Sequence, residues 1–529
     1  MSPLATQTEQ YWVDGFEITQ ADIDHLYSVL LERETPLSVD EMALIVVRYR
    51  IEQEESAGRP SAASGNAYRP GDHYEVGDEL VFPVYGGVLG KVTGTRPGSN
   101  PVSGDFTVLQ VDANGEQMEF AADLKADHVL NQEVIDEPEE DDTGLTPEDI
   151  FIEYGGEVAT ALEARLSQQD DLVRLAGRWF PRSLLADVNV GHLNLAEAVL
   201  DMAGGGPLST PDIVEQMGLV SDGNLRLAEF SLNYGLQRDE RFDEVGPAGL
   251  VLWFLKRMEP DEVLNAPPRL AYKPIPFDRA ALPPDLQALE AEIGDEHSDI
   301  PARKAPRPQS ATLLLTYPHK RAGTLPLSPQ LRLMFPTAYE APRIRFTLID
   351  AETDEEIPAW VVRPGGYVYG LKEWFAEHEV PVGGYLTVQR GEDPSRVRIG
   401  FAKRKPRIEW IRTALIDGTR LVFENRKWSM GSEYDELMVL AVDDPDALDA
   451  AWTRTTHTNV PLDTLVQDMC RQLAPLGPQG TVHAKTLYSA INLLRRCPPG
   501  PIFELLAQSG EFENVGGPYW KLKGVASAS

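Results

Sequence analysis

The hydrophobic residues between Leu193 and Met258 recur at the spacing of three short helices followed by two strands. In the first helix, which Asn194 is placed to cap, apolar residues recur every three to four positions until a run of three glycines ends it. Ser209 or Thr210 caps the second helix, and Leu225–Leu236 forms the third. An acidic and aromatic strand, a glycine-proline turn and an apolar strand follow. This order predicts a winged helix-turn-helix module.

A similar order of elements recurs near the C-terminus. Leu462–Leu473 and Ala484–Leu494 are predicted helices separated by glycines, and an aromatic strand ends the segment. FDEVGPAGLVLWFLK at 242–256 and FENVGGPYWKLK at 512–523 both run from Phe through an acidic residue to Val-Gly, a turn and a strand. Repetition favours a second copy of one module over two unrelated helix-hairpin pieces. Near the N-terminus, TPLSVDEMA echoes GPLSTPDIV, which predicts another helix-turn-helix piece without a wing.

The first of these segments resembles a known family. The turn GPLSTPDIVEQMGL and the wing entry RDERFDEVG are similar to the HARE-HTH winged-helix module, which occurs in the delta subunit of bacterial RNA polymerase and in DNA-associated proteins. The resemblance covers roughly 65 residues of the chain, the span of the one predicted module. It implies contacts with RNA polymerase or with another DNA-processing complex.

Short strands separated by glycine turns predict a small, strongly bent β-barrel of the Tudor kind near the N-terminus. Asp112, Asn114 and Gly115 supply a hairpin turn signal within it. Its opening, VGDELVFPVYGGVLGKVTGT, resembles the start of the polymerase-interacting domain of CarD-type transcription factors. That resemblance again implies a polymerase partner.

The predicted fold class is α+β and multi-domain, with two winged modules, a Tudor-like barrel and a β-rich domain. Prolines interrupt regular structure after the first winged module, and we place the main domain boundary there. In chain order the predicted segments are a helical pair (1–57), the barrel (69–131), an acidic linker (132–149), a helical segment with the first winged module (150–258), a proline-rich linker (259–310), the β-rich domain (311–452) and the C-terminal winged module (453–529).

Composition narrows the class of protein. The chain has 529 residues and a net charge of −35, and a strongly acidic protein repels DNA unless a local basic patch overrides the average. No apolar run is long enough to span a membrane, and MSPLATQTEQYW is not a signal peptide. The two cysteines, Cys470 and Cys497, form no disulfide framework. We therefore expect a cytoplasmic protein with no membrane partner.

No catalytic signature is present. The chain lacks a phosphate-binding GxxxxGK[ST] loop, an HExxH motif and a GxSxG motif. The nine histidines have no metal-ligand spacing, so we expect no metal and no cofactor. The prediction is a protein that is not an enzyme.

Basic residues gather at two places in this acidic chain. The first follows a predicted strand and lies near Trp410 and Trp428, a combination suited to phosphate contact and base stacking. The second lies where the third helix of the C-terminal winged module is expected. The alternative for the first group is a solvated strand face paired with local acids, and the C-terminal module could contact either protein or DNA. The candidate nucleic-acid contacts are Lys403, Arg404, Lys405, Arg407, Lys485, Arg495 and Arg496.

The first winged module differs in charge. Its third helix carries few basic residues, and acidic residues occupy the wing. A DNA-facing wing needs Lys or Arg, so this copy is expected to contact protein. The acidic wing residues are Asp239, Glu240, Asp243 and Glu244.

We interpret the chain as a non-enzymatic, transcription- or DNA-associated adaptor. Its winged modules are expected to bind RNA polymerase, another DNA-processing complex or DNA itself. The alternative is a protein-interaction scaffold of a DNA defence or restriction system that does not contact nucleic acid. A third reading, an enzyme with an unrecognised site, would require a deep polar pocket between residues 311 and 452.

Overall fold

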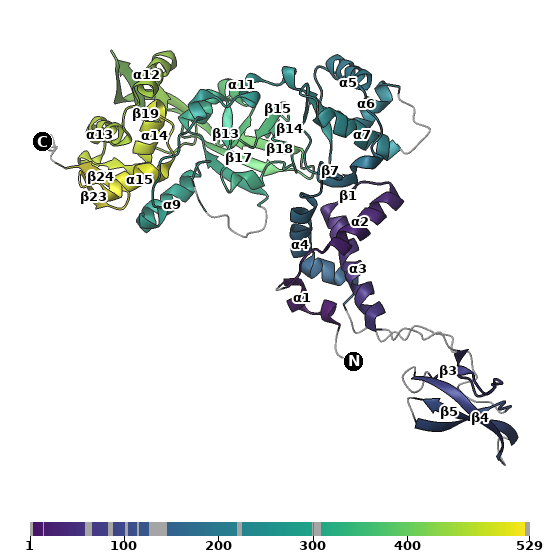
Figure 1. The fold of residues 1–529 in the computed structure, drawn as a ribbon. Coiled ribbons are helices and arrows are strands. Elements are labelled where there is room, and N and C mark those ends of the chain that lie inside the picture. Colours follow the sequence, from purple (N-terminus) through teal and green to yellow (C-terminus); the bar gives the residue numbers. More distant parts are fainter. Residues whose placement is uncertain are drawn as a thin grey trace. The chain divides into compact units, whose positions relative to one another are not determined.

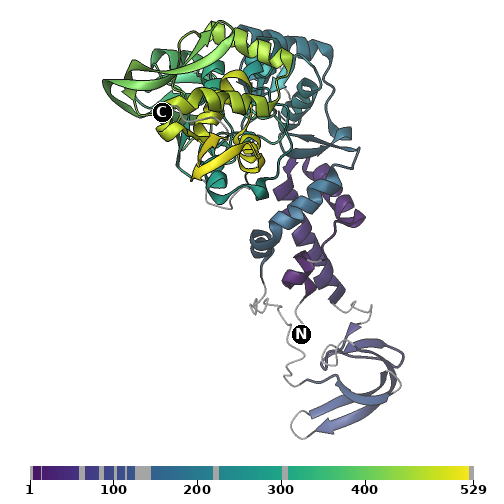
Figure 2. The same ribbon diagram turned by 90° about the vertical axis from the view of Figure 1, so that its left-hand side faces the viewer.

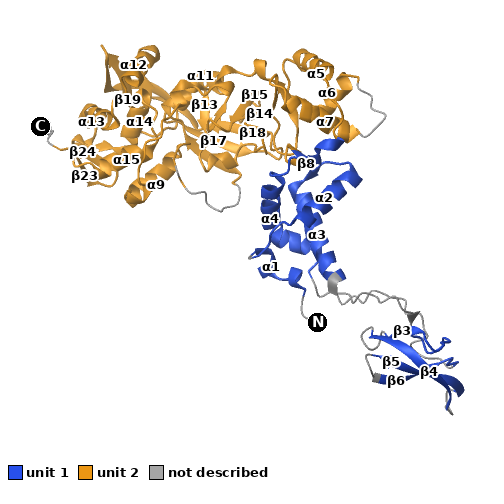
Figure 3. Cartoon of the chain, in the orientation of Figure 1, with its two compact units in different colours: residues 1–173, 179–184 blue, residues 174–178, 185–529 orange. Residues whose placement is uncertain are grey.

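The computed structural model describes residues 4–13, 15–58, 66–82, 88–100, 104–113, 116–125, 145–218, 225–298, 300 and 308–523. It is an α+β protein of several domains (Figure 1). Two compact units divide the chain, residues 1–173 with 179–184 and residues 174–178 with 185–529 (Figure 3). None of the helices in the described residues is both long enough and apolar enough to cross a bilayer.

The segment predicted as the first winged module has the expected order of elements. Its short strands form a sheet in the order β10-β11-β9, so the last strand lies between the other two. The first helix begins earlier than predicted, because Asn189 rather than Asn194 caps it: its side-chain oxygen accepts from the backbone N–H groups of Gly191 and His192. The elements are α5 (Val190–Met202), β9 (Leu208–Ser209), α6 (Thr210–Gln216), α7 (Leu225–Gln237), β10 (Phe242–Glu244) and β11 (Leu252–Leu255).

The C-terminal segment has the same connectivity. Its sheet runs β22-β24-β23, and the two predicted helices match the observed bounds. The elements are α13 (Leu462–Leu473), β22 (Val482–His483), α14 (Ala484–Leu494), α15 (Pro499–Gln508), β23 (Phe512–Gly516) and β24 (Tyr519–Leu522). The two repeats therefore share one topology.

A third copy stands at the N-terminus, where the sequence indicated only a helical pair. The expectation of a piece without a wing is wrong, because the wing follows the insertion of residues 59–146. The elements are α2 (Gln20–Arg33), β1 (Leu37–Ser38), α3 (Val39–Gly58), α4 (Pro147–Leu166), β7 (Leu172–Leu175) and β8 (Arg178–Pro181). The sheet order is again first, third, second strand, β1-β8-β7. Helix α4 packs with α2 and α3 in one hydrophobic core, so the predicted grouping of residues 150–185 with the following module is also wrong.

Two positions recur in all three copies. The residue that ends the first strand caps the second helix, and its side chain accepts a backbone N–H from the first turn. The last strand carries a buried tryptophan. The caps are Ser38, Ser209 and His483, and the tryptophans are Trp179, Trp253 and Trp520.

The histidine cap predicts a local dependence on pH. His483 Nδ1 accepts from the Lys485 N–H at 3.1 Å, which requires a neutral ring nitrogen. Burial lowers the pKa of His483 to about 4. Because the folded pKa lies below the unfolded value, this contribution to stability is complete above pH of about 6.5 and declines as the pH falls toward 4.

We expect hydrogen exchange in α14 to accelerate between pH 6.5 and 4.5, after correction for the intrinsic rate. His483→Asn keeps a capping acceptor but does not titrate, so the acceleration should be smaller in that variant. An equal acceleration in both proteins would contradict a role for the imidazole.

The inserted segment forms a five-stranded sheet in the order β2-β3-β4-β5-β6. Tyr68, Leu80, Phe82 and Leu109 are among the residues of its own small core. Its elements are β2 (Asn66–Ala67), β3 (Glu79–Phe82), β4 (Val88–Asn100), β5 (Gly104–Ala113) and β6 (Glu116–Ala122). Most of the predicted acidic linker, residues 132–144, lies outside the described residues.

The proline-rich segment is not the domain boundary that its composition predicted. It contains α8 (Asp261–Leu264) and α9 (Pro284–Ile293), and α9 contributes Leu286, Leu289 and Ile293 to the core of the C-terminal module. Both flanking regions belong to one compact unit. Prolines limit regular backbone hydrogen bonding, but they do not prevent apolar side chains from packing.

The β-rich domain holds a seven-stranded sheet in the order β12-β17-β18-β14-β15-β16-β13. Its core includes Trp374 and Phe375 of the short helix α11 (Lys372–Glu377), whereas Tyr317 of helix α10 (Tyr317–Ala322) belongs to the core that contains the C-terminal module. The strands are β12 (Ser310–Leu314), β13 (Thr324–Pro326), β14 (Arg343–Asp350), β15 (Glu356–Val362), β16 (Tyr367–Tyr369), β17 (Tyr385–Arg390) and β18 (Arg396–Phe401). A helix, α12 (Pro445–Thr458), leads into the C-terminal module.

Candidate nucleic-acid interface

The basic run lies on a long β-hairpin. Strands β19 (Lys403–Asp417) and β20 (Arg420–Ser432) pair in antiparallel register, joined by a tight turn in which Gly418 has φ of 61°. A short parallel strand, β21 (Ala441–Val442), adds to β19. Figure 2 shows the pair in green as a long two-stranded ribbon on unit 2. The two strands carry eight Lys and Arg against three Asp and Glu, the opposite balance to the whole chain.

One end of the hairpin is anchored and the other is exposed. Ala414, Leu421 and Phe423, near the turn, belong to the core that contains the C-terminal module. Ile411 and Met430 pack into a smaller adjoining cluster. Toward the open end, side chains such as Ile408 and Trp410 are exposed to solvent. The packed residues therefore hold the exposed part of the hairpin in place.

The predicted basic cluster divides into paired and unpaired cations. Lys403 forms an ion pair with Glu352, and Arg404 forms one with Glu409. Lys405 and Arg407 are exposed, and no described carboxylate lies within 4 Å of either cation. Two of these four predicted contacts are therefore the better placed to meet an external anion.

Exposed apolar side chains stand beside these cations. Ile408 is 75 % exposed and Trp410 is 66 % exposed, although both are large hydrophobic residues. Lys427 lies opposite Trp410 in the register, with its ammonium 5.1 Å from the ring centroid. Because burial normally covers such side chains, this exposed combination marks a binding surface. By strand alternation Ile408, Trp410 and Lys427 share one face of the hairpin, whereas Arg407, which pairs with Met430, lies on the other face. We call the exposed stretch made by Lys405, Arg407, Ile408, Trp410 and Lys427 the hairpin patch.

The predicted cations of the C-terminal module are structural. Lys485 is 2 % exposed and pairs with Asp435 and Glu292, at the start of the second helix rather than on the third. Arg495 is half-buried and donates to the carbonyl of Val460. Both side chains are engaged in contacts within the folded chain, so neither contributes to an exposed basic face.

Arg496 is buried and forms ion pairs within the folded chain. Its guanidinium contacts Asp295 and Glu296, each at 2.7 Å. Burial opposes ionisation of Glu296, but the charges of Arg496 and His319 outweigh it and hold the pKa of Glu296 well below its usual range. The network joins the proline-rich segment, helix α10 and the C-terminal module.

Two of the three third helices, α15 and α4, lack the basic residues that a DNA-binding helix needs. Helix α15 contains one charged residue, Glu504, and packs against α9. Helix α4 carries Glu148, Asp149, Glu153, Glu157 and Glu163 against a single arginine. Contacts with DNA phosphates need cations, so charge alone disfavours insertion of either helix into a groove.

The wing of the middle repeat contacts protein, within unit 2. Arg343 of β14 pairs with Asp243, and the Arg345 N–H donates to the carbonyl of Val245 at 2.8 Å. Burial at this contact raises the pKa of Glu244 to about 8. The acidic wing was expected to bind protein, and the protein it meets here is the β-rich domain of its own chain.

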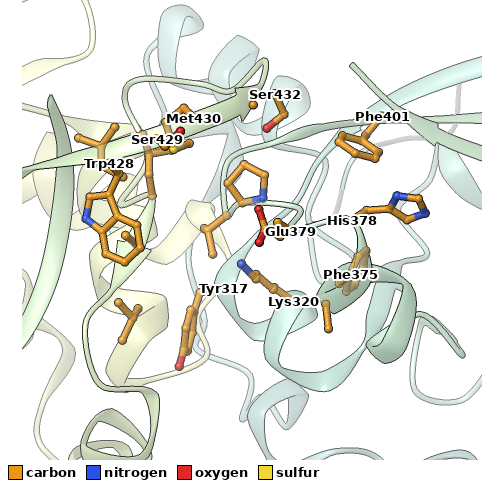
Figure 4. Close-up of a pocket in the computed structure, with 18 of the residues that line it drawn as sticks. Tyr317, Lys320, Phe375, His378, Glu379, Phe401, Trp428, Ser429, Met430 and Ser432 are labelled. Atoms are coloured by element: carbon orange, nitrogen blue, oxygen red, sulfur yellow. The ribbon is translucent and has the colours of Figure 1, made fainter. Parts of the chain in front are cut away.

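The structure also reveals a pocket that no sequence motif indicated (Figure 4). Its volume is about 880 Å³, within the range of small-molecule sites. One wall comes from α10 and α11, and the opposite wall comes from the buried side of the hairpin. Its side chains come from positions scattered between 317 and 445, which is why no local spacing predicted it. Among the lining residues are Tyr317, Lys320, Lys372, Phe375, His378, Glu379, Phe401, Trp428 and Met430.

His378, which lines the pocket, is hydrogen-bonded to a carboxylate that has several other partners. His378 Nε2 lies 2.7 Å from Asp350 Oδ2, but Asp350 also accepts from the Trp374 indole and from two backbone amides. Among the described contacts, no serine or cysteine is hydrogen-bonded to His378. The described residues also contain no cluster suited to a metal ion.

Comparisons of the chain with protein-family models, with curated protein sequences and with solved structures found no match.

Proposed function

We propose that the protein is a non-enzymatic adaptor that binds nucleic acid with accessible bases through the hairpin patch. The observation that carries the proposal is Trp410, which is 66 % exposed beside the Lys427 ammonium in a chain of net charge −35. Cations contact phosphates, and exposed aromatic rings stack on bases. The packed base of the hairpin holds both groups on one rigid element.

The three repeats have a different role in this proposal. Their connectivity suits winged-helix modules, but two of the third helices lack a basic face and the middle wing is docked on protein. We propose that the exposed acidic helix α4 contacts a basic protein surface of RNA polymerase or another DNA-processing complex. The adaptor would then act in the cytoplasm, linking such a complex to nucleic acid.

The test is a titration of the full chain with a labelled single-stranded oligonucleotide at several salt concentrations. Three cations of the patch, Lys405, Arg407 and Lys427, predict a slope of log K against log salt of about −2. Trp410→Ala should weaken binding by roughly tenfold or more, because stacking of one base contributes about 1–3 kcal/mol. The matching duplex should bind less tightly, since its bases are already stacked.

Two controls separate the patch from general charge effects. Trp410→Phe keeps an aromatic face and should retain most of the affinity. Arg471→Ala removes an exposed cation elsewhere, on α13, and should change little. Absence of binding, absence of a salt dependence or full affinity in Trp410→Ala would overturn the proposal.

A second function, an interaction scaffold of a DNA defence or restriction system, is favoured by the acidic face of α4. Residues Glu148, Glu153 and Glu157 on that helix suit a basic protein partner. Affinity purification from the native cell, with nuclease present to remove bridging nucleic acid, distinguishes the two. Recovery of polymerase subunits supports the first function, and recovery of nuclease or helicase subunits supports the second.

A further inference from the structure

The pocket between the hairpin and helices α10 and α11 has the chemistry of a nucleotide site. It lies on the opposite side of the hairpin from the exposed Trp410: Ile411, Trp428 and Met430 of the same two strands face into it. We propose that this pocket binds one nucleotide, with its phosphate at Lys320 and Lys372 and its base against one of the aromatic rings that line the pocket. The inference rests on the proposed function for the class of ligand.

The basic side chains that line the pocket are the candidate contacts for the phosphate. Four basic residues line the pocket, but Arg321 is committed to Asp446 and Asp449, and Lys403 is committed to Glu352. Lys320 and Lys372 have no described carboxylate within 4 Å. These two ammonium groups are therefore available to a ligand.

Lys320 is the more buried of these two lysines. It projects from α10 into the cavity, as Figure 4 shows, and is half-buried. Burial without a counter-charge lowers the pKa of this lysine. A phosphate beside it would supply the missing negative charge and favour the charged amine.

One carboxylate also lines the pocket. The side chain of Glu379 points into the same space but does not come within 4 Å of the Lys320 ammonium. With this single carboxylate, the pocket lining still has more basic than acidic side chains. Its position beside the lysines offers an acceptor for an amine or hydroxyl of the ligand.

Three aromatic side chains line the pocket and offer surfaces for a base. Phe375, Phe401 and Trp428 come from three separate elements and all line the cavity. Trp428 is 39 % exposed although it faces the pocket, so part of its ring is uncovered. Figure 4 shows Trp428 on one side of Lys320 and Phe375 and Phe401 on the other. Flat apolar rings beside a cation fit a molecule with an aromatic base and an anionic phosphate.

The experiment is calorimetric titration of the full chain with adenosine 5′-monophosphate, ribose 5-phosphate and adenosine. We expect the complete nucleotide to bind at least tenfold more tightly than either fragment. Lys320→Met and Lys372→Met should each weaken nucleotide binding at least fivefold. Because Lys372 is exposed, loss of binding in that variant is not explained by misfolding, and thermal melting checks the Lys320 variant.

The control is the triple variant Lys405→Ala, Arg407→Ala and Lys427→Ala, which should lose affinity for the oligonucleotide but keep its affinity for the mononucleotide. No binding of the mononucleotide, or binding unchanged in both lysine variants, overturns the pocket assignment while leaving the hairpin proposal standing. If the triple variant binds oligonucleotide normally, the hairpin proposal fails and the pocket assignment is judged by its own titration.

A competition experiment identifies the source of the nucleotide. If the mononucleotide displaces a 5′-phosphorylated oligonucleotide from the wild-type chain, the pocket receives the end of a strand. If both bind together, the pocket receives a free nucleotide. Either result supports a nucleotide site.

Discussion

Arg496→Met is expected to destabilise the C-terminal region by about 3–5 kcal/mol, because it leaves two buried carboxylates without their counter-charge. Asp295 and Glu296 are each at most 2 % exposed in their side chains and share the Arg496 guanidinium. Glu296 would keep its contact with His319, at 3.1 Å, but Asp295 would keep only neutral donors such as the Tyr488 hydroxyl. Urea denaturation with hydrogen exchange in α14 and α15 measures the loss.

Two further variants test whether charge is the reason. Arg471→Met removes an arginine from an exposed ion pair with Asp468 and should cost about 0–1 kcal/mol. Adding Asp295→Asn and Glu296→Gln to Arg496→Met should recover part of the loss, because neutral amides are less costly to bury than unpaired carboxylates. A loss of stability that is the same with and without the two amide substitutions would argue for packing instead of charge.

Trp253→Ala is expected to destabilise the middle repeat by about 3–5 kcal/mol. The ring is fully buried, and its indole N–H donates to Asn233 Oδ1 at 2.7 Å. The same amide oxygen accepts from the Thr210 hydroxyl, so truncation removes one member of a buried polar group as well as a large apolar volume. Hydrogen exchange in α5, α6 and α7 isolates this repeat from the rest of a multi-domain chain.

Trp253→Phe serves as the matched variant, since it keeps an aromatic ring but lacks the indole N–H. It should lie between the wild type and Trp253→Ala. Trp410→Ala removes a tryptophan that is 66 % exposed and should leave exchange in the middle repeat unchanged. Rapid exchange in α13 and α14 caused by Trp253→Ala would contradict the view that each repeat has its own core.

The repeat was predictable where the chain is continuous. In α13 and α14 the apolar residues recur at helical spacing and a glycine-containing break separates them, so local pattern alone predicted both bounds. The N-terminal copy was missed because its second and third helices are separated by residues 59–146. An echo of the turn at Pro36–Ser38 was visible, but no local pattern connects that turn to a strand at Arg178–Pro181.

The candidate site was predicted in part. The run at Lys403–Arg407 and the interleaved Trp410 were visible as a basic and aromatic pattern, and the structure places them on one hairpin. Lys485 and Arg496 are also basic, but they pair with acids 50 and 201 positions away, at Asp435 and Asp295. A cation's sequence neighbours do not reveal such partners.

Residue pattern by itself determined the helices and wings of the middle and C-terminal repeats and the acidic character of the middle wing, because spacing and turn chemistry act over a few neighbouring residues. Tertiary structure alone decided which cations remain free, which tryptophan is exposed and that a pocket lies behind the hairpin. The physical reason is that burial and ion pairing depend on residues distant in sequence, and these meet only when the chain has folded.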